Sequence, residues 1–589
     1  MKANLYRWWM GAFLLCATAT GAAQTQWHDP MEAEVPYLSG RAWNEEIGNR
    51  SFHRMPDRMQ ADMPKAVWGL SKNSAGLSVK FLSNTNNVKV KYTIDKVGGY
   101  VNMAKLDHAG VDLYARDADG SQHWIGNHMG WNFGDTITIT YNDIKTDKFA
   151  NRGLEFELFL PPYSTVTSMQ IGVDEGSKFK FLHESAERPI VVYGSSIVQG
   201  ASPSRPGLMW VTQVKRDMDY PVVNLGFSGS ALMEPALFDA MSEIPARAYV
   251  LDPIPNSYKL GEEIVSRMVS GVKHLRTKSD APILLIENAG PVDSVFRRDL
   301  YEQYAAGNRM LRKAYDELVE WGVDSLYYLT MAEIGMDEDS YIEGTHPNDI
   351  GNRLQAKAVE KKLHEMLSED TPNHRYPPIR QHRDGIYTWM ERHNDVINLN
   401  HTIDPEVLCI GNSITHFWGG EPASHKNGGK TWDKLWGKRR VVNMGFGWDR
   451  IENVFWRINH GELEGCSPKD IFLLIGINNI NAGDKEEDVA RGIVDLAAAI
   501  HARQPQATLY VVEIYAAKGR EEKVEKTNAL LREWLPTDEK VRLINLNRVL
   551  TLNDGSGKIN PEMFGDGLHP NEKGYAALAS ELKKQTGMK

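Results

Sequence analysis

The chain has 589 residues, of which 42% are hydrophobic and 24% are charged, an ordinary composition for a soluble globular protein. One hydrophobic core rarely organises more than about 250–300 residues, so we expect about three domains. The formal net charge of −10 argues against binding to nucleic acid or to an anionic membrane through bulk electrostatics.

The first residues have the pattern of a secretory signal peptide. Lys2 and Arg7 supply positive charge, an apolar run from 8 to 17 follows, and Gly21-Ala22-Ala23 has the small residues of a signal-peptidase site. The apolar run is shorter than the roughly 20 residues that a membrane-spanning helix needs. We therefore expect residues 1–23 to be cleaved, and the mature protein to be periplasmic or secreted without membrane insertion.

The cysteines predict neither a lipid anchor nor a crosslink. Cys16 follows Leu15, where a lipoprotein normally has a small residue, so we expect no lipidation. The mature chain keeps Cys409 and Cys466, which lie in different parts of one predicted domain. We expect both to be free thiols, and the fold to be stabilised by core size rather than by disulfides.

Residues 24–186 are predicted to form an antiparallel β-sandwich of jelly-roll type. Polar and apolar residues alternate in the runs 77–82, 88–94 and 135–141, with Asn/Gly turns between them. Short alternating strands of this kind are typical of a sandwich. No nucleophile–base pattern occurs in this region.

Three weaker features of the β region could also carry a function. Asp117-Ala118-Asp119-Gly120 resembles the start of a calcium loop, but the later ligand positions do not fit an EF-hand, so a turn is the favoured interpretation. Trp124 and Trp131 could stack on sugar rings, although core or interface packing is favoured. With no metal-ligand spacing and no phosphate loop, we expect no metal and no cofactor.

Two later regions, 187–370 and 385–589, have the texture of doubly wound α/β domains. In each, five apolar runs without alternation, typical of buried parallel strands, alternate with helical stretches. A polar, Pro-containing linker at 371–384 separates them. The pattern predicts a tandem repeat of one flavodoxin-like unit with a parallel five-stranded sheet. The predicted strands are 189–193, 221–225, 248–251, 282–286 and 325–329, then 406–410, 441–444, 471–475, 509–514 and 541–546.

A serine follows the first strand of each unit. Ser196 comes after Gly194-Ser195, and Ser413 comes after Gly411-Asn412. Ligands of open α/β folds bind at this carboxyl edge of the sheet. The alternative is a serine that only caps the following helix, which is common at such a turn.

An acid-x-x-His sequence lies near the end of each unit, with Glu343 before His346 and Asp566 before His569. The serine and the histidine are 150 residues apart in the first unit and 156 in the second. A serine hydroxyl is a weak nucleophile and needs a general base, usually a histidine oriented by a carboxylate. The repeated spacing predicts two Ser–His–acid sites.

Two further blocks match between the units. Residues 224–229 and 443–448 follow the second strand of each unit, and Asn256 and Asn478 follow the third. Ester hydrolysis needs donors aimed at the tetrahedral oxyanion, which a backbone N–H and an Asn amide could supply. Taken alone, the glycines would be turn residues and the asparagines helix caps.

The four matching blocks of each unit carry a serine, a glycine-containing loop, an asparagine and a histidine in chain order. In this order they resemble the SGNH, or GDSL-type, hydrolases, over about residues 189–367 and 387–584. The second unit is similar to the catalytic subunits of platelet-activating-factor acetylhydrolase, in the stretch from 443 to 479 and at 503–507. The first unit resembles a GDSL-type lipase family that follows a β domain with a Gly-x-Asp-Leu-Tyr signature, here at residues 110–114.

The resemblance implies a role for each matched residue. Ser196 and Ser413 would be the nucleophiles, His346 and His569 the general bases, and Glu343 and Asp566 the acids that orient them. The oxyanion holes would contain the backbone N–H of each nucleophile, with Gly229 and Asn256 in the first site and Trp448 and Asn478 in the second. Three features depart from the family pattern: Ser195 and Asn412 replace the acid before the nucleophile, Glu343 replaces Asp, and Trp448 replaces a glycine.

We therefore expect an exported serine esterase that removes acetyl or other short acyl groups from a polysaccharide or oligosaccharide through an acyl-enzyme. Xylan, pectin and O-acetylated sialic acid all fit as substrates. One alternative is a lipid or phospholipid acetylhydrolase. A second alternative is a glycan-binding protein in which one or both hydrolase units are inactive. The sequence makes no prediction of oligomeric state.

Overall fold

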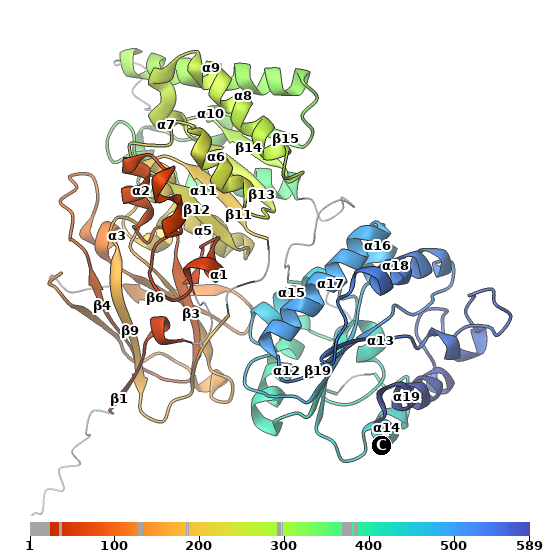
Figure 1. Ribbon diagram of the computed structural model, residues 1–589. Helices are drawn as coiled ribbons and strands as arrows, with labels where there is room; N and C mark the ends of the chain where they lie inside the picture. The colour runs from red at the N-terminus through yellow and green to blue at the C-terminus, as the bar shows by residue number, and fades with distance from the viewer. Residues whose placement is uncertain are drawn as a thin grey trace, which may run out of the picture.

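The computed structural model describes residues 24–33, 38–127, 133–183, 185, 188–290, 296, 298–367, 380–381, 387–423 and 425–588. The predicted signal peptide, Trp131 and most of the predicted linker lie outside these ranges. Within them, no helix is both long and apolar enough to cross a membrane. Figure 1 shows the β region below the first α/β unit and beside the second.

The N-terminal region contains two antiparallel sheets. Its strands are β1 (Thr25–His28), β2 (Leu38–Ser39), β3 (Ser78–Ser83), β4 (Val88–Ile94), β5 (Asp112–Arg116), β6 (Gln122–Asn127), β7 (Ile137–Tyr141), β8 (Leu154–Phe159), β9 (Val166–Asp174) and β10 (Phe179–Phe181). One sheet has the order β1-β9-β4-β7, and the other β10-β3-β8-β5-β6, with β2 paired to β3. Tyr92 of β4 and Phe156 of β8 are fully buried in one shared hydrophobic cluster. The jelly-roll connectivity stays a prediction.

The same region also contains helices that its period-2 pattern did not predict. They are α1 (Asn44–Ile47), α2 (Lys65–Ser71) and α3 (Lys105–Ala109). Trp43, Val67 and Trp68 are buried in a hydrophobic cluster with the strands of the first α/β unit. This segment of the predicted β domain therefore packs as part of its neighbour, because its apolar side chains find their partners there.

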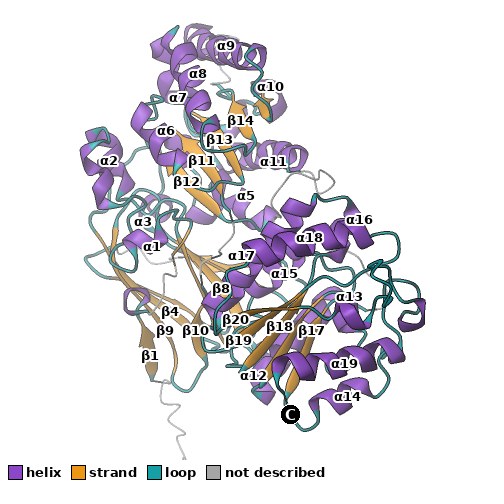
Figure 2. Ribbon diagram, turned by 45° about the vertical axis from the view of Figure 1, so that its right-hand side comes forward, coloured by secondary structure: helices purple, strands orange, loops and turns teal. Residues whose placement is uncertain are grey.

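The first α/β unit has a five-stranded parallel sheet in the order β12-β11-β13-β14-β15. Its strands are β11 (Ile190–Gly194), β12 (Val222–Gly226), β13 (Ala248–Asp252), β14 (Ile283–Ile286) and β15 (Leu326–Leu329). Its helices are α4 (Ser196–Gln199), α5 (Trp210–Met218), α6 (Pro235–Ser242), α7 (Ile254–Ser257), α8 (Glu263–Arg276), α9 (Arg298–Glu320), α10 (Met331–Ile334) and α11 (Asp349–Met366). Val191 and Tyr193 face one hydrophobic cluster and Ile190 and Val192 the other, so both faces of the sheet are covered (Figure 2).

The second α/β unit repeats this plan with the sheet order β17-β16-β18-β19-β20. Its strands are β16 (Val407–Gly411), β17 (Val441–Gly445), β18 (Asp470–Leu474), β19 (Thr508–Val512) and β20 (Val541–Ile544). Its helices are α12 (Trp389–Ile403), α13 (Ser413–His416), α14 (Thr431–Trp436), α15 (Ile451–Asn459), α16 (Ile477–Ala482), α17 (Glu486–Arg503), α18 (Glu521–Trp534) and α19 (Glu572–Thr586). The predicted pair of parallel sheets in flavodoxin-like order is confirmed. Cys409 and Cys466 are free thiols, as predicted.

The Gly-x-Asp-Leu-Tyr signature joins the β region to the loop that follows α4. Asp112 is fully buried and accepts hydrogen bonds from Arg205 and from the indole N–H of Trp124, both at 2.5 Å. Arg205 also donates to the hydroxyl of Tyr114 at 2.6 Å and lies over the ring of Trp124, 4.5 Å from its centroid. Trp124 therefore packs against Arg205 at this junction, while 49% of its surface remains exposed.

A cluster of charges joins the β region to both α/β units. Arg116 of β5 contacts Glu155 of β8 at 3.3 Å and Asp219, just after α5, at 2.6 Å. From the second unit, His460 lies 3.1 Å from Glu155, and the indole of Trp456 donates to Asp219 at 2.6 Å. Burial alone would raise the pKa of Glu155, but the charges of His460 and Arg116 hold it well below its usual range. The two units are thus fixed to one another through the β region.

We predict that Arg116→Met destabilises the protein strongly, because it removes the main cationic partner of the Asp219 carboxylate and one of those that, beside His460, stabilise the Glu155 carboxylate. Removing one member of a buried ion pair costs about 3 kcal/mol of unfolding free energy. The matched control is Arg58→Met, since the Arg58 side chain is 48% exposed and its ion pairs with Glu46 and Glu243 are each worth about 1 kcal/mol or less. Denaturant unfolding would measure both, and equal losses would contradict the role given to the cluster.

Candidate active sites

Each predicted nucleophile begins a short helix at the carboxyl edge of its sheet. Ser196 is the first residue of α4, and Ser413 is the first residue of α13. The residue before each serine caps the helix: Ser195 accepts a backbone hydrogen bond at 3.3 Å, and Asn412 accepts one at 3.0 Å. The capping role considered for Ser196 therefore falls to its neighbour. The residue that replaces Asp of the usual Gly-Asp-Ser pattern, Ser195 in one unit and Asn412 in the other, is therefore the helix cap.

In the first unit, the predicted triad residues form one line of hydrogen bonds. Oγ of Ser196 lies 2.8 Å from Nε2 of His346, and Nδ1 of His346 is hydrogen-bonded to the carboxylate of Glu343. That carboxylate also accepts from the backbone N–H groups of Thr345 and His346, each at 3.1 Å. With the proton on Nδ1, Nε2 is free to accept the serine proton, which is what a general base requires.

The second unit has the same hydrogen-bonded triad. Oγ of Ser413 lies 2.9 Å from Nε2 of His569, and Nδ1 of His569 lies 2.7 Å from Asp566. Asp566 also accepts from the backbone N–H groups of Leu568 and His569, at 2.9 and 2.7 Å. Burial raises the pKa of Asp566, but these hydrogen bonds outweigh it and hold the pKa below its usual value. The carboxylate is therefore ionised and can stabilise a protonated imidazole.

The exchange of Asp for Glu in the first unit leaves this pattern intact. Glu343 and Asp566 each accept hydrogen bonds from Nδ1 of the histidine three residues later, from the backbone N–H of that histidine and from the backbone N–H of the residue before it. Their side chains are 42% and 57% exposed. The loop of the first unit thus accommodates the extra methylene group without breaking the line.

The loop after the second strand contains the predicted oxyanion residues, and we call residues 226–230 and 445–449 the oxyanion loops. Gly229 has φ +65° and Trp448 has φ +63°, so the two backbones follow the same left-handed path. Asn256 on α7 donates to the carbonyl of Ser230, and Asn478 on α16 donates to a carbonyl of the second loop at 2.9 Å. The asparagine predicted in each oxyanion hole therefore lies against its loop.

Two residues that the sequence analysis missed hold these loops against the nucleophile helices. Gln199 on α4 accepts a hydrogen bond from the N–H of Ser228 at 2.8 Å, and Nδ1 of His416 on α13 accepts one from Gly447 at 3.1 Å. Burial, helped by the charge of Arg392, lowers the pKa of His416 to about 2. The ring is therefore neutral and able to accept.

A buried arginine supports the same loop in each unit, and each arginine precedes the first strand of its unit. Arg54, from the segment between α1 and α2, donates to the carbonyls of Asn224 and Gly226 at 3.0 and 2.9 Å. Arg392 on α12 donates to the two equivalent carbonyls of the second unit, both at 2.8 Å. The sequence could not predict either contact, because an arginine outside the motif blocks cannot be told from a surface residue in the sequence.

The β region also reaches the first site. The side-chain amide of Asn102, in the segment between β4 and α3, lies 3.2 Å from Nδ1 of His346. The hydroxyl of Tyr163 donates to the carbonyl of Ser196 at 3.3 Å, and Tyr100 packs edge-on against Tyr163 with 5.3 Å between the ring centroids. The first site is therefore built from two domains.

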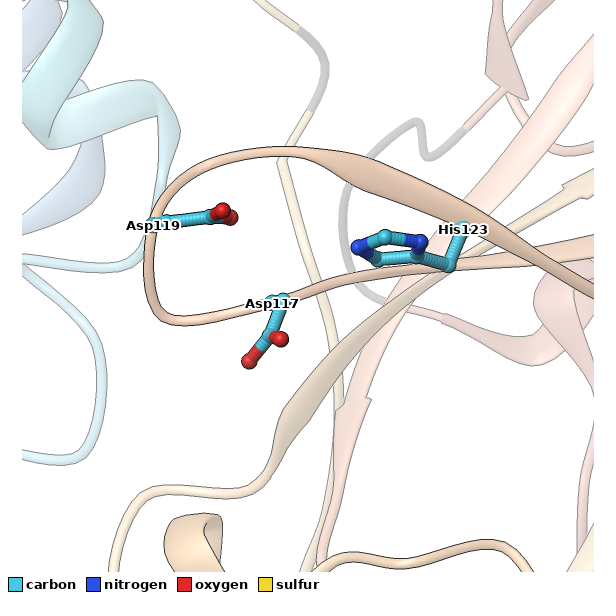
Figure 3. Close-up of side chains that lie close together, drawn as sticks. All are labelled: Asp117, Asp119 and His123. Atoms are coloured by element: carbon cyan, nitrogen blue, oxygen red, sulfur yellow. The ribbon is translucent and has the colours of Figure 1, made fainter.

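The acidic turn between β5 and β6 brings together Asp117, Asp119 and His123 (Figure 3). Their ligand atoms lie within 4.8 Å of one another, a grouping that could hold a metal ion. The hydroxyl of Ser121 donates to Asp119 at 2.5 Å and lies 2.8 Å from the His123 ring. The N–H of Gly120 donates to the carbonyl of residue 117 at 2.9 Å. These bonds close the turn that the sequence predicted.

An open parallel sheet with a serine, a histidine and a carboxylate hydrogen-bonded in line at its carboxyl edge is the arrangement of a serine hydrolase. Comparison with known families agrees. Residues 187–364 and 409–577 each match the GDSL-like lipase/acylhydrolase family, and residues 25–179 match the N-terminal region of SGNH-hydrolase-type esterases.

Individual relatives lead to the same class. The chain is 30% identical over 202 residues to subunit alpha2 of platelet-activating factor acetylhydrolase IB from Homo sapiens and from Rattus norvegicus, which covers 34% of this chain and 83% of each relative. A crystal structure described as a GDSL-like lipase from Bacteroides ovatus is 30% identical, with a TM-score of 0.53, and the match covers 58% of this chain and 98% of that one. The chain therefore belongs to the GDSL-like lipase/acylhydrolase family, and it is an SGNH-type esterase with two hydrolase units in tandem.

We predict that Asp566→Asn, made in a Ser196→Ala background, lowers kcat of the second site by about three to four orders of magnitude, because the amide favours the wrong tautomer of the histidine. Hydrolysis of 4-nitrophenyl acetate would measure this loss. Glu562→Gln is the matched control, since Glu562 is a neighbouring exposed acid that pairs with Lys573. A kcat for Asp566→Asn equal to that of the control would contradict the assignment.

Proposed function

We propose that the protein is a carbohydrate O-acetylesterase with two active sites, which cleaves acetyl or other short acyl esters through an acyl-enzyme. The observation that carries the proposal is the same hydrogen-bonded line of Ser, His and carboxylate in both units. Intact Ser–His–carboxylate geometry in both units argues against a chain in which one or both units are inactive. For this reason the glycan-binding alternative ranks last.

The chemistry would proceed as two acyl transfers. Oγ of Ser196 attacks the ester carbonyl carbon while Nε2 of His346 takes the hydroxyl proton. The oxyanion forms beside the backbone N–H groups of Ser196 and Gly229 and the amide of Asn256. The bond to the sugar oxygen then breaks, and the histidine gives its proton to that oxygen. Water, deprotonated by His346, attacks the acyl-enzyme and releases acetate and free serine. Ser413, His569, Trp448 and Asn478 would do the same in the second site.

Two observations favour a short acyl group and a substrate outside the cytoplasm. The matched relatives are acetylhydrolases by name. A signal-peptide pattern precedes the fold and fits a substrate outside the cytoplasm. A lipid acetylhydrolase is the second candidate, because those same relatives act on platelet-activating factor by name.

We further propose that residues 1–23 direct export to the periplasm or medium and are removed. In this proposal the jelly-roll sandwich of residues 24–186 buttresses the first hydrolase domain (187–370) and is not an independent glycan-binding module. The buried contacts of Arg54 and Asp112 with that unit support the buttress role. The second hydrolase domain (385–589) follows the linker at 371–384.

The test is acetate release from 4-nitrophenyl acetate, from acetylated xylan, pectin and sialic acid, and from an acetylated phospholipid. Wild type would be compared with Ser196→Ala, Ser413→Ala and the double variant. We expect each single variant to lose activity on different carbohydrate esters and the double variant to lose it on all. Release from the phospholipid alone would favour the lipid alternative, and a double variant as active as wild type would exclude both triads.

A further inference from the structure

The two sites carry different side chains at two equivalent positions of their rims. Four residues after the nucleophile, the first unit has Gly200 and the second has Phe417. At the predicted oxyanion residue, the first unit has Gly229 and the second has Trp448. The second site therefore has two aromatic side chains where the first has none.

Phe417 lies beside the general base of the second site. Its ring centroid is 5.4 Å from that of His569, and the side chain is partly exposed. The ring thus forms one wall next to the atom that would receive the serine proton. Gly200, its counterpart, ends α4 with φ +116° and has no side chain to offer.

The backbone of the oxyanion loop directs the indole of Trp448 toward open space. Gly229 has nearly the same φ, and a Cβ placed on it would meet no atom within 4 Å. A side chain at this position therefore projects from the loop into open space. Trp448 accordingly remains 39% exposed, although the residues around it in the loop are buried.

The left-handed conformation of Trp448 is enforced by its neighbours in the loop. The carbonyl of Gly447 accepts the hydroxyl of Tyr387 at 2.9 Å, and the carboxylate of Asp449 accepts Nε of buried Arg457 at 2.8 Å. A bulky residue with positive φ is rare, and such strained positions persist only where the surrounding structure imposes them, commonly at functional sites. A glycine would adopt this backbone more easily, so the presence of an indole at this position indicates that the side chain has a functional role.

We propose that Trp448, together with Phe417, forms an aromatic wall that binds the sugar ring of the ester's alcohol part in the second site. The inference rests on the proposed esterase function and adds a substrate-recognition element that Gly200 and Gly229, at the equivalent positions of the first site, do not provide. An aromatic face can cover the apolar C–H face of a sugar ring while the sugar hydroxyls stay in water. The exposure of the indole suits the side from which the alcohol leaves, since an acyl pocket is enclosed.

The experiment measures acetate release by the second site alone, in a Ser196→Ala background, from glucose pentaacetate and from ethyl acetate, which has no ring. Trp448→Gly is expected to lower kcat/KM for glucose pentaacetate about tenfold more than kcat/KM for ethyl acetate, through a raised KM for the sugar ester. The KM of Trp448→Phe for glucose pentaacetate should fall between those of the parent and of Trp448→Gly. The melting temperature of Trp448→Gly should equal or exceed that of the parent, because glycine relieves the left-handed strain.

Trp321→Ala is the matched control, since Trp321 is another tryptophan, 69% exposed, directly after α9 in the other unit. This variant should leave kcat/KM unchanged for both substrates. Equal losses on both substrates with Trp448→Gly would overturn the proposal and assign Trp448 to the geometry of the oxyanion loop. An unchanged KM would overturn it as well. If the parent cleaves ethyl acetate but no sugar ester, the proposed carbohydrate function itself fails, an outcome distinct from both.

Discussion

The close passage of the oxyanion loop over the nucleophile helix is the constraint on which both sites depend. The parallel register aligns Gly194 with Gly226 and Gly411 with Gly445, so the helix and the loop leave the sheet at the same level. A Cβ on Gly226 would lie 2.1 Å from the backbone N of Gln199, and the corresponding distance at Gly445 is 2.2 Å, far below any contact distance. Only glycine permits this approach, which places the loop beside the serine.

The sequence predicted the features that strand order alone determines. Ser196 and His346 are 150 residues apart, yet both follow strands of one parallel sheet, so their meeting could be inferred from the pattern. The contacts of Arg54 and Asn102 could not, because they depend on how the β region docks. The pattern of period two also missed helices α1 and α2, whose apolar residues serve the core of the neighbouring unit. Tertiary packing, which local periodicity does not contain, decided these cases.

The two units share their hydrogen-bonded core but differ in what surrounds it. The first site is bordered by the β region, through Asn102 beside His346. The second is bordered by its own aromatic side chains, Phe417 and Trp448. The charge cluster around Arg116 holds the two units in one arrangement.

The most direct test of this account is covalent labelling with a fluorophosphonate, followed by peptide mapping by mass spectrometry. The account predicts one adduct on Ser196 and one on Ser413. It also predicts that His569→Ala abolishes the second adduct and leaves the first. Absence of label from both serines, in a protein that unfolds cooperatively, would contradict the claim that the chain contains two serine-esterase sites.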